Sequence, residues 1–190
     1  MPSTHEPIIQ CRAAQLSDAA AIAAIYAPIV RDTCISFEVE PPDSDVVRQR
    51  IRAGAAVYPW LVAELEGVVV GYAYASKHRE RAAYRWSVDV SAYVSERVRG
   101  VGIGRALYER LLKILRQQGF RAVFAGIALP NPASVRLHEA VGFTAVGVYR
   151  EVGFKLGHWR DVGWWQLKLS ADDAPPAEPI AFAALRPPVL

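Results

Sequence analysis

The sequence is poor in the residues that build disulfide scaffolds and metal centres. Its two cysteines, Cys11 and Cys34, have no CxxC spacing, and its four histidines form no cluster with them. A disulfide framework and a zinc site are therefore not indicated, and we expect no metal. Two reduced, buried thiols are the expected state.

Long apolar runs are also missing. No segment reaches the ~18 consecutive apolar residues that cross a bilayer. Residues 1–7 lack the basic start and apolar run of a signal peptide. We therefore expect no contact with a membrane and a cytoplasmic protein.

Excess charge is small. The formal net charge is +3 and the isoelectric point is near 9.0, which indicates a mildly basic surface. Aromatic RNA-binding motifs are absent, so a nucleic-acid partner is disfavoured. The arginines between positions 77 and 105 keep that alternative open, and salt-sensitive binding to oligonucleotides would test it. A local site for a small anion would explain the basic excess equally well.

The chain is long enough to bury one substantial core. It has 190 residues, of which 52% are hydrophobic, and this length favours one domain over two. We assign residues 1–170 to that domain. Residues 171–190 are rich in alanine and proline and are expected to form an extended C-terminal tail.

Hydrophobic periodicity predicts alternating strands and helices. Helices are expected from a cap at Ser17-Asp18, from position 43 or 44 to 52, from 103 to 118, and from 131 to 142. Strands are expected at 8–12, 60–64, 68–75, 86–94, 122–129, 145–149 and 162–169. This order predicts an α/β (α+β) fold with a mixed central sheet flanked by helices. In the strand at 86–94, Val88 and Val90 should face the core, leaving Asp89 and Tyr93 available for chemistry.

A glycine-rich turn joins that strand to the most regular amphipathic helix. It reads Arg99-Gly100-Val101-Gly102-Ile103-Gly104-Arg105. Glycines let backbone N–H groups approach an anion, and a helix start offers unpaired N–H donors, so a pyrophosphate would bind here. A Walker loop is excluded because Gly-Lys-Ser/Thr is absent, and neither register fits the dinucleotide fingerprint. A tight turn without a ligand is the alternative.

This turn resembles the Q/R-x-x-G-x-G/A signature of GNAT acetyltransferases. Within that superfamily the chain is similar to the phosphinothricin N-acetyltransferase group. The similarity extends over residues 9–169 and includes Tyr58-Pro59-Trp60-Leu61-Val62-Ala63-Glu64, Gly71-Tyr72-Ala73-Tyr74-Ala75, Ala83-Tyr84-Arg85-Trp86 and Gly157-His158-Trp159-Arg160-Asp161-Val162-Gly163. The resemblance implies a single-domain GNAT fold.

The resemblance also implies acetyl-CoA as co-substrate. The turn would wrap its pyrophosphate, and the strand end would pair with its pantetheine arm as an additional strand. The residues implied in binding are Ala92, Tyr93, Val94, Arg99, Gly100, Val101, Gly102, Ile103, Gly104, Arg105, Asn131 and Ser134. Asn131 also has the sequence position of a helix N-cap, and both roles can hold together.

Two residues are the catalytic candidates. Asp89 lies five residues before Val94, which is ~17 Å up the strand at ~3.3 Å per residue. The resembled group usually has glutamate there, as a general base, so the shorter aspartate would act through water. His138 follows the leucine of the second motif and would protonate the leaving thiolate, with Tyr93 as a reserve donor. The alternatives are a solvated strand carboxylate and a surface histidine.

The acceptor is expected to be a small amine. Arg81 and Tyr84, in a basic stretch before the catalytic strand, would hold an anionic group, and Phe37 would form a wall of the pocket. The resemblance implies the α-amino group of phosphinothricin, methionine sulfoximine or methionine sulfone. It also implies a homodimer in which the loop near Arg81 and the C-terminal strands share a site. Alternatives are a solvated basic loop, a core role for Phe37, a protein-acetylating enzyme, and a CoA-binding protein without catalysis.

Overall fold

The computed structural model describes residues 8–171 and 176–185, so the expectation for residues 1–7 and part of the expected tail lie outside it. The strands are β1 (Gln10–Ala13), β2 (Trp60–Leu65), β3 (Val68–Lys77), β4 (Ser87–Val94), β5 (Ala122–Ala128), β6 (Thr144–Lys155) and β7 (His158–Lys168). The α-helices are α1 (Ala19–Asp32), α2 (Ser44–Gly54), α3 (Ile103–Gln118) and α4 (Pro132–Ala140). In these residues no helix combines the length and apolar character needed to cross a bilayer.

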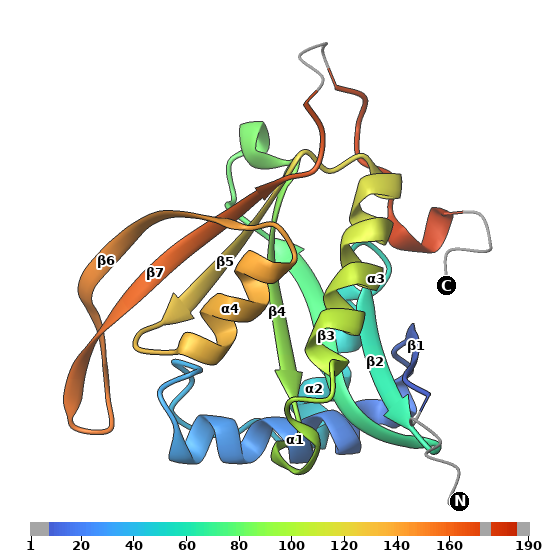
Figure 1. The fold of residues 1–190 in the computed structure, drawn as a ribbon. Helices are drawn as coiled ribbons and strands as arrows, with labels where there is room; N and C mark the ends of the chain where they lie inside the picture. The colour runs from blue at the N-terminus through green and yellow to red at the C-terminus, as the bar shows by residue number, and fades with distance from the viewer. Residues whose placement is uncertain (1–7, 172–175, 186–190) are drawn as a thin grey trace, which may run out of the picture.

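The strands form one seven-stranded sheet in the order β1-β2-β3-β4-β5-β7-β6. All neighbours are antiparallel except β4 and β5, which run parallel. Helices cover the sheet, as Figure 1 shows. The predicted α/β fold with a mixed sheet and flanking helices is confirmed.

Two hydrophobic cores lie on opposite faces of the sheet. Leu61 and Ala73 belong to the core that contains α3. Their neighbours Val62 and Tyr72 belong to the core that contains α1 and α2. This alternation follows from the two-residue period of a strand. On the sheet face opposite α3, Tyr93 of β4 packs against the core that contains α1. Only part of this face of β4 is therefore available for chemistry.

Two helix starts test the predicted caps. The side chain of Asp43 accepts hydrogen bonds from the backbone N–H groups of Asp45 and Val46, so the cap of α2 is confirmed. Helix α1 begins where predicted, with Asp18 at its N-cap position, but the Asp18 side chain makes no capping hydrogen bond. Asp18 instead accepts from the Arg12 guanidinium at 2.7 Å and from the Gln15 backbone, because a buried carboxylate gains more from a cation than from a helix end.

The C-terminal strands form a longer hairpin than the sequence indicated. The predicted strands at 145–149 and 162–169 are extended in β6 and β7 through residues 150–161, which turn at Leu156-Gly157. The register shifts between Tyr149 and Gly153, and Glu151 has a φ of 46° there. A bulge of this kind interrupts the alternation that marks a strand.

Residues 176–185 are not a freely extended tail. The Ile180 N–H donates to the Gln118 carbonyl at 2.7 Å, and Phe182 and Leu185 pack on the α3 core. The apolar side chains of this segment pack between the end of α3 and the loop at 56–57. The two cysteines are free as expected, but both are half-buried and not fully buried.

Candidate active site

The central parallel strands diverge. β4 and β5 pair only through residues 87–89 and 122–124, after which they separate (Figure 1). The Ser95 N–H donates to Val70 across the β3 side, so alternation places the backbone groups of Tyr93 toward β3 and those of Ala92 and Val94 toward the gap. In the described part of the chain, the latter two residues have no strand partner on that side.

A helix begins beside this gap. Gly100 and Gly102 adopt φ values of 86° and 90°, which glycine reaches without strain, and α3 starts at Ile103. The first N–H bonded within the helix is that of Ala106, to Gly102 at 3.0 Å, so Ile103, Gly104 and Arg105 present free donors and the positive end of the helix dipole.

The residues around the start of α3 differ in exposure and in their ion-pair partners. Val101 is exposed at the tip of the turn, and Ile103 is buried in the core. Arg99 pairs with Glu96 and Arg105 pairs with Glu109, both on the surface. The two arginines thus flank the turn in sequence, and each guanidinium is paired with a carboxylate.

Helices α3 and α4 meet at the end of β4. A Cβ atom on Gly104 would lie 3.0 Å from Leu137 and 3.8 Å from Val94, so glycine allows a close approach. Asn131 caps α4 by accepting from the Ser134 N–H at 3.1 Å, which confirms the predicted N-cap.

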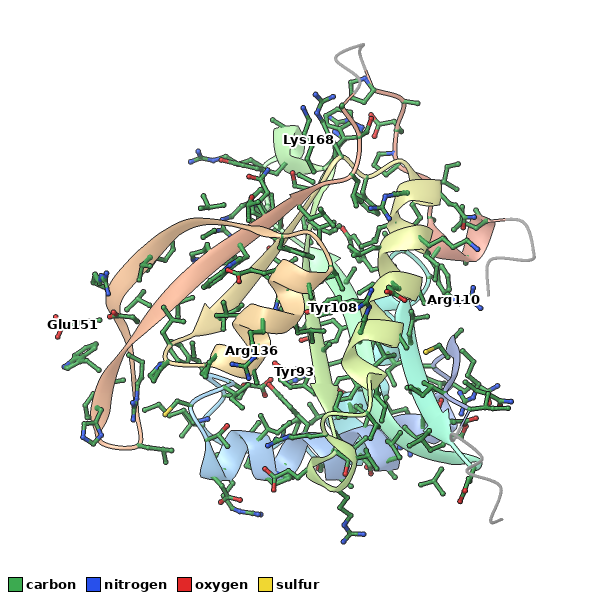
Figure 2. The ribbon with its side chains drawn as sticks, in the orientation of Figure 1. Tyr93, Tyr108, Arg110, Arg136, Glu151 and Lys168 are labelled. Carbon is green, nitrogen blue, oxygen red and sulfur yellow. The ribbon has the colours of Figure 1, made fainter. Side chains whose placement is uncertain are left out.

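A pocket opens on the other side of the sheet, where β4 and β5 part. Its volume is about 370 Å³, and it is lined by Ile35, Ser36, Phe37, Tyr93, Gly126, Ala128, Val152, Val162 and Trp164. Phe37 therefore lies at the pocket and not in a core. Tyr93 is the lining residue that β4 contributes, and its side chain is labelled in Figure 2. The loop after α1, the divergent strands and the terminal hairpin together enclose a site large enough for a small molecule.

Asp89 lies at the point where β4 and β5 begin to diverge. Its Oδ1 is 2.7 Å from Nδ1 of His78, a residue that sequence analysis did not select. Burial raises the pKa of Asp89 above its ordinary value, while the hydrogen bond with His78 and the charge of Arg79 act in the opposite direction. The histidine ring stacks on Phe124 at 4.3 Å.

His138 is buried, with an exposed fraction of 5%. Its Nδ1 lies 2.7 Å from the Ser134 carbonyl, which can only accept, so Nδ1 carries the proton. Its Nε2 lies 2.8 Å from the hydroxyl of Tyr108 and accepts from it; Figure 2 shows Tyr108 on the side of α3 that faces α4. Burial lowers the pKa of His138. In its neutral form this imidazole has no N–H left to give to a leaving group.

The predicted anion-binding residues are only partly brought to the pocket. Arg81 is exposed, and Tyr84 is exposed but lies 5.9 Å from the His78 ring. Arg79 belongs to the predicted basic stretch but was not singled out in it. Its guanidinium lies 5.6 Å from the centre of the Trp164 ring, and Trp164 lines the pocket. The alternating charges of the stretch gave no signal to separate Arg79 from its neighbours.

A family profile described as an acetyltransferase (GNAT) domain matches residues 11–164. The chain belongs to the GNAT acetyltransferases. It is 42% identical over 173 residues to a phosphinothricin N-acetyltransferase of Streptomyces viridochromogenes, covering 90% of this chain and 94% of that one. It is 38% identical to an L-methionine sulfoximine/L-methionine sulfone acetyltransferase of Salmonella typhimurium, covering 87% and 98%.

A solved structure gives the same assignment. The GNAT superfamily phosphinothricin acetyltransferase of Sinorhizobium meliloti, in complex with acetyl-CoA, superposes with a TM-score of 0.87 at 37% identity, covering 93% of this chain and 97% of that one. The resemblance inferred from the glycine-rich turn is thus confirmed, and the GNAT chain described here is an acetyltransferase.

Several backbone groups of this chain are suited to hold acetyl-CoA. Free N–H donors at the start of α3 suit its diphosphate, and the backbone of Ala92 and Val94 suits the amides of its arm. When bound, acetyl-CoA supplies an activated acetyl group. The chain itself supplies the binding surface and the polar groups near Asp89.

Proposed function

We propose that this protein transfers the acetyl group of acetyl-CoA to the α-amino group of a small, amino-acid-like acceptor of the phosphinothricin or methionine sulfoximine type. One observation carries the proposal: β4 and β5 no longer pair beyond residues 89 and 124, and the start of α3, next to Val94, and the pocket, which includes Tyr93, both lie at this end of β4. A co-substrate held at the helix could therefore present its reactive end to an acceptor in the pocket.

The chemistry of the pocket supports an amine with an anionic or strongly polar partner group. An amine must be neutral to attack a thioester, and most amino groups are protonated near neutral pH, so the Asp89 region provides the base. Arg79, together with Arg81 and Tyr84, is suited to hold the acceptor's oxygen atoms. The names of the two relatives describe acceptors of this class.

In this proposal His138 has a structural role and is not the proton donor. Its N–H is committed to Ser134, and burial disfavours the charged form that would have a second proton to donate. We therefore assign its hydrogen bonds to the joint between α3 and α4 rather than to proton donation to the leaving thiolate.

The test is release of free thiol from acetyl-CoA with a panel of acceptors. Phosphinothricin, methionine sulfoximine and methionine sulfone should react, while ordinary amino acids, polyamines and peptides should react more slowly. N-acetylated phosphinothricin is the matched control, because it retains every group except the free amine. A preference for peptides would overturn the acceptor class. Acetyl-CoA binding without turnover of any amine would indicate a binding protein.

We also propose that the protein is a homodimer that uses the β6–β7 hairpin. β6 is the edge strand of the sheet, and exposed strand edges and apolar patches mark interaction surfaces. Along the hairpin the large exposed apolar side chains are Val146, Val148, Tyr149, Val152, Phe154, Leu156 and Trp159. The hairpin also lines the pocket, so dimerisation would stabilise the acceptor site.

A further inference from the structure

We propose that His78 is the group that accepts the proton of the acceptor amine, with Asp89 holding its ring in place. The inference rests on the proposed function, since it names the base of the same site. It departs from the expectation that the Asp89 carboxylate is itself the base.

The geometry of the pair supports this assignment. Asp89 Oδ1 and His78 Nδ1 are 2.7 Å apart, and the two side chains are exposed by 28% and 10%. Residues 76 and 89 are opposite each other in the β3–β4 ladder, and residues 89 and 124 are opposite each other in the β4–β5 ladder. Because opposite residues share a face, Asp89, His78 and Phe124 all lie on the pocket side of the sheet.

The tautomer follows from the partner. A carboxylate only accepts, so the hydrogen bond requires the proton of the neutral imidazole to be on Nδ1. The other ring nitrogen, Nε2, then has a free lone pair, and no residue in the described part of the chain accepts from it or donates to it. An imidazole whose Nδ1–H is held by a carboxylate and whose Nε2 is free has the arrangement of a general base.

Packing fixes the ring beside a residue that lines the pocket. His78 stacks on Phe124 at 4.3 Å with an interplanar angle of 17°, and its ring centre lies 6.3 Å from that of Trp164, which lines the pocket. The titratable and charged groups around the ring are Asp89 from β4, Tyr84 from the short helix before it, and Arg79 from its own loop. Phe124 and Trp164 bring no charge from β5 and β7.

The proton transfer balances with the reaction. The acceptor ammonium loses one proton to Nε2 of His78, which becomes imidazolium and later releases that proton to water. The neutral amine forms the C–N bond to the acetyl carbonyl while the C–S bond breaks, and a second proton from the same nitrogen ends on the sulfur. Asp89 keeps its charge throughout and stabilises the imidazolium.

Three variants separate the roles of the two residues. His78→Phe keeps a flat ring against Phe124 and removes both nitrogens, so kcat at pH 7 should fall about 100-fold, the lower end of what a general base contributes. The KM for acetyl-CoA should not change. The loss should shrink as pH rises, because hydroxide and free amine then replace the base. Asp89→Asn should also lower kcat.

The double variant decides between the two bases. If Asp89 acts only through His78, adding Asp89→Asn to His78→Phe should change kcat by less than about threefold, whereas independent roles would multiply. Multiplicative losses, or a His78→Phe enzyme with wild-type kcat and pH profile, would overturn the inference.

A spectroscopic measurement tests the inference without turnover. Long-range ¹H–¹⁵N correlation of the free wild-type protein above pH 8, with His78→Phe for assignment, should show His78 as the Nδ1–H tautomer. Asp89→Asn should increase the Nε2–H form. An Nε2–H tautomer in the wild type would refute the assignment. Thiol release by the wild type tests the proposed function separately, so failure of either can be recognised.

Discussion

At the scale of single residues, the buried imidazole of His138 links folding to pH. Burial lowers its pKa below the ordinary value near 6.5, so the unfolded chain binds the proton more readily than the folded one. Its stabilising contribution should be complete above pH 6.5 and should decline as pH falls through the lowered folded-state pKa. Urea unfolding at pH 8, 6.5 and 5.5 should show this decline.

The matched variant for this prediction is His138→Gln. It should lower the free energy of unfolding at pH 8 by about 1–3 kcal/mol, because it disturbs the buried hydrogen bonds to Tyr108 and Ser134. It should also abolish most of the decline between pH 6.5 and 5.5. His158→Gln should keep that decline. An unchanged pH dependence in the His138 variant would contradict the assignment.

Gly153 controls the position of Phe37. A Cβ atom at Gly153 would lie 2.2 Å from Cε2 of Phe37, so the ring must move out of the pocket wall in a Gly153→Ala variant. The KM for the acceptor should rise severalfold while the KM for acetyl-CoA stays constant. Gly147→Ala on the same strand is the control, since nothing lies within 4 Å of its Cβ position. Equal kinetics in both variants would remove Phe37 from the acceptor site.

The role of a residue could be predicted where it depends on the local sequence alone. Asp89 on its strand and Asn131 at a helix start were selected from local sequence. The partnership of Asp89 with His78 was not, because the two residues are 11 positions apart and meet only through the β3–β4 register. His138 was open to interpretation as a surface residue, because its burial depends on contact between α3 and α4.

At the scale of elements, α3 has a left-handed glycine at each end. Gly102 precedes it with φ 90° and Gly119 follows it with φ 85°, and a Cβ atom at either position would meet nothing within 4 Å. Alanine at either position should therefore cost a similar ~1–2 kcal/mol of stability through the backbone alone. Only Gly102→Ala should also weaken acetyl-CoA binding, because it disturbs the N–H donors of the helix start.

Calorimetric titration with acetyl-CoA, alongside urea unfolding, measures both effects. Gly119→Ala should bind like the wild type despite its lower stability. If both variants lose the same affinity, the effect is on folding and the donors at the start of α3 are not the diphosphate site. Because both variants replace a left-handed glycine by alanine, a difference in acetyl-CoA affinity between them can be assigned to the start of α3.

The helix α3 and the hairpin differ in how far sequence determined them. Ile103, Leu107 and Leu111 recur at helical spacing, and all three are buried in one core, so local pattern and tertiary contact agree. Most side chains of the hairpin between 150 and 161 are exposed, and its one buried side chain, Lys155, is charged. Without a buried apolar face, its periodicity carries little information about a strand.

At the scale of the whole molecule, the tip of the hairpin exposes large aromatic side chains in the isolated chain. Phe154 and Trp159 are exposed by 61% and 62%, and their rings lie 5.5 Å apart. Light scattering should give a mass twice the 20.9 kDa of one chain. Trp159→Glu should give a monomer, because a charge buried in an apolar interface without a partner is strongly unfavourable.

The control for that variant is Val68→Glu, a charge placed on an equally exposed apolar residue at the β2–β3 turn, which is exposed by 62% and lies outside the hairpin. It should remain dimeric. Because Val152, Val162 and Trp164 of the hairpin line the pocket, the Trp159→Glu monomer should show a higher KM for the acceptor and an unchanged affinity for acetyl-CoA. A monomer with wild-type acceptor KM would mean that each chain forms its acceptor site alone, so that the apolar hairpin serves association and not catalysis.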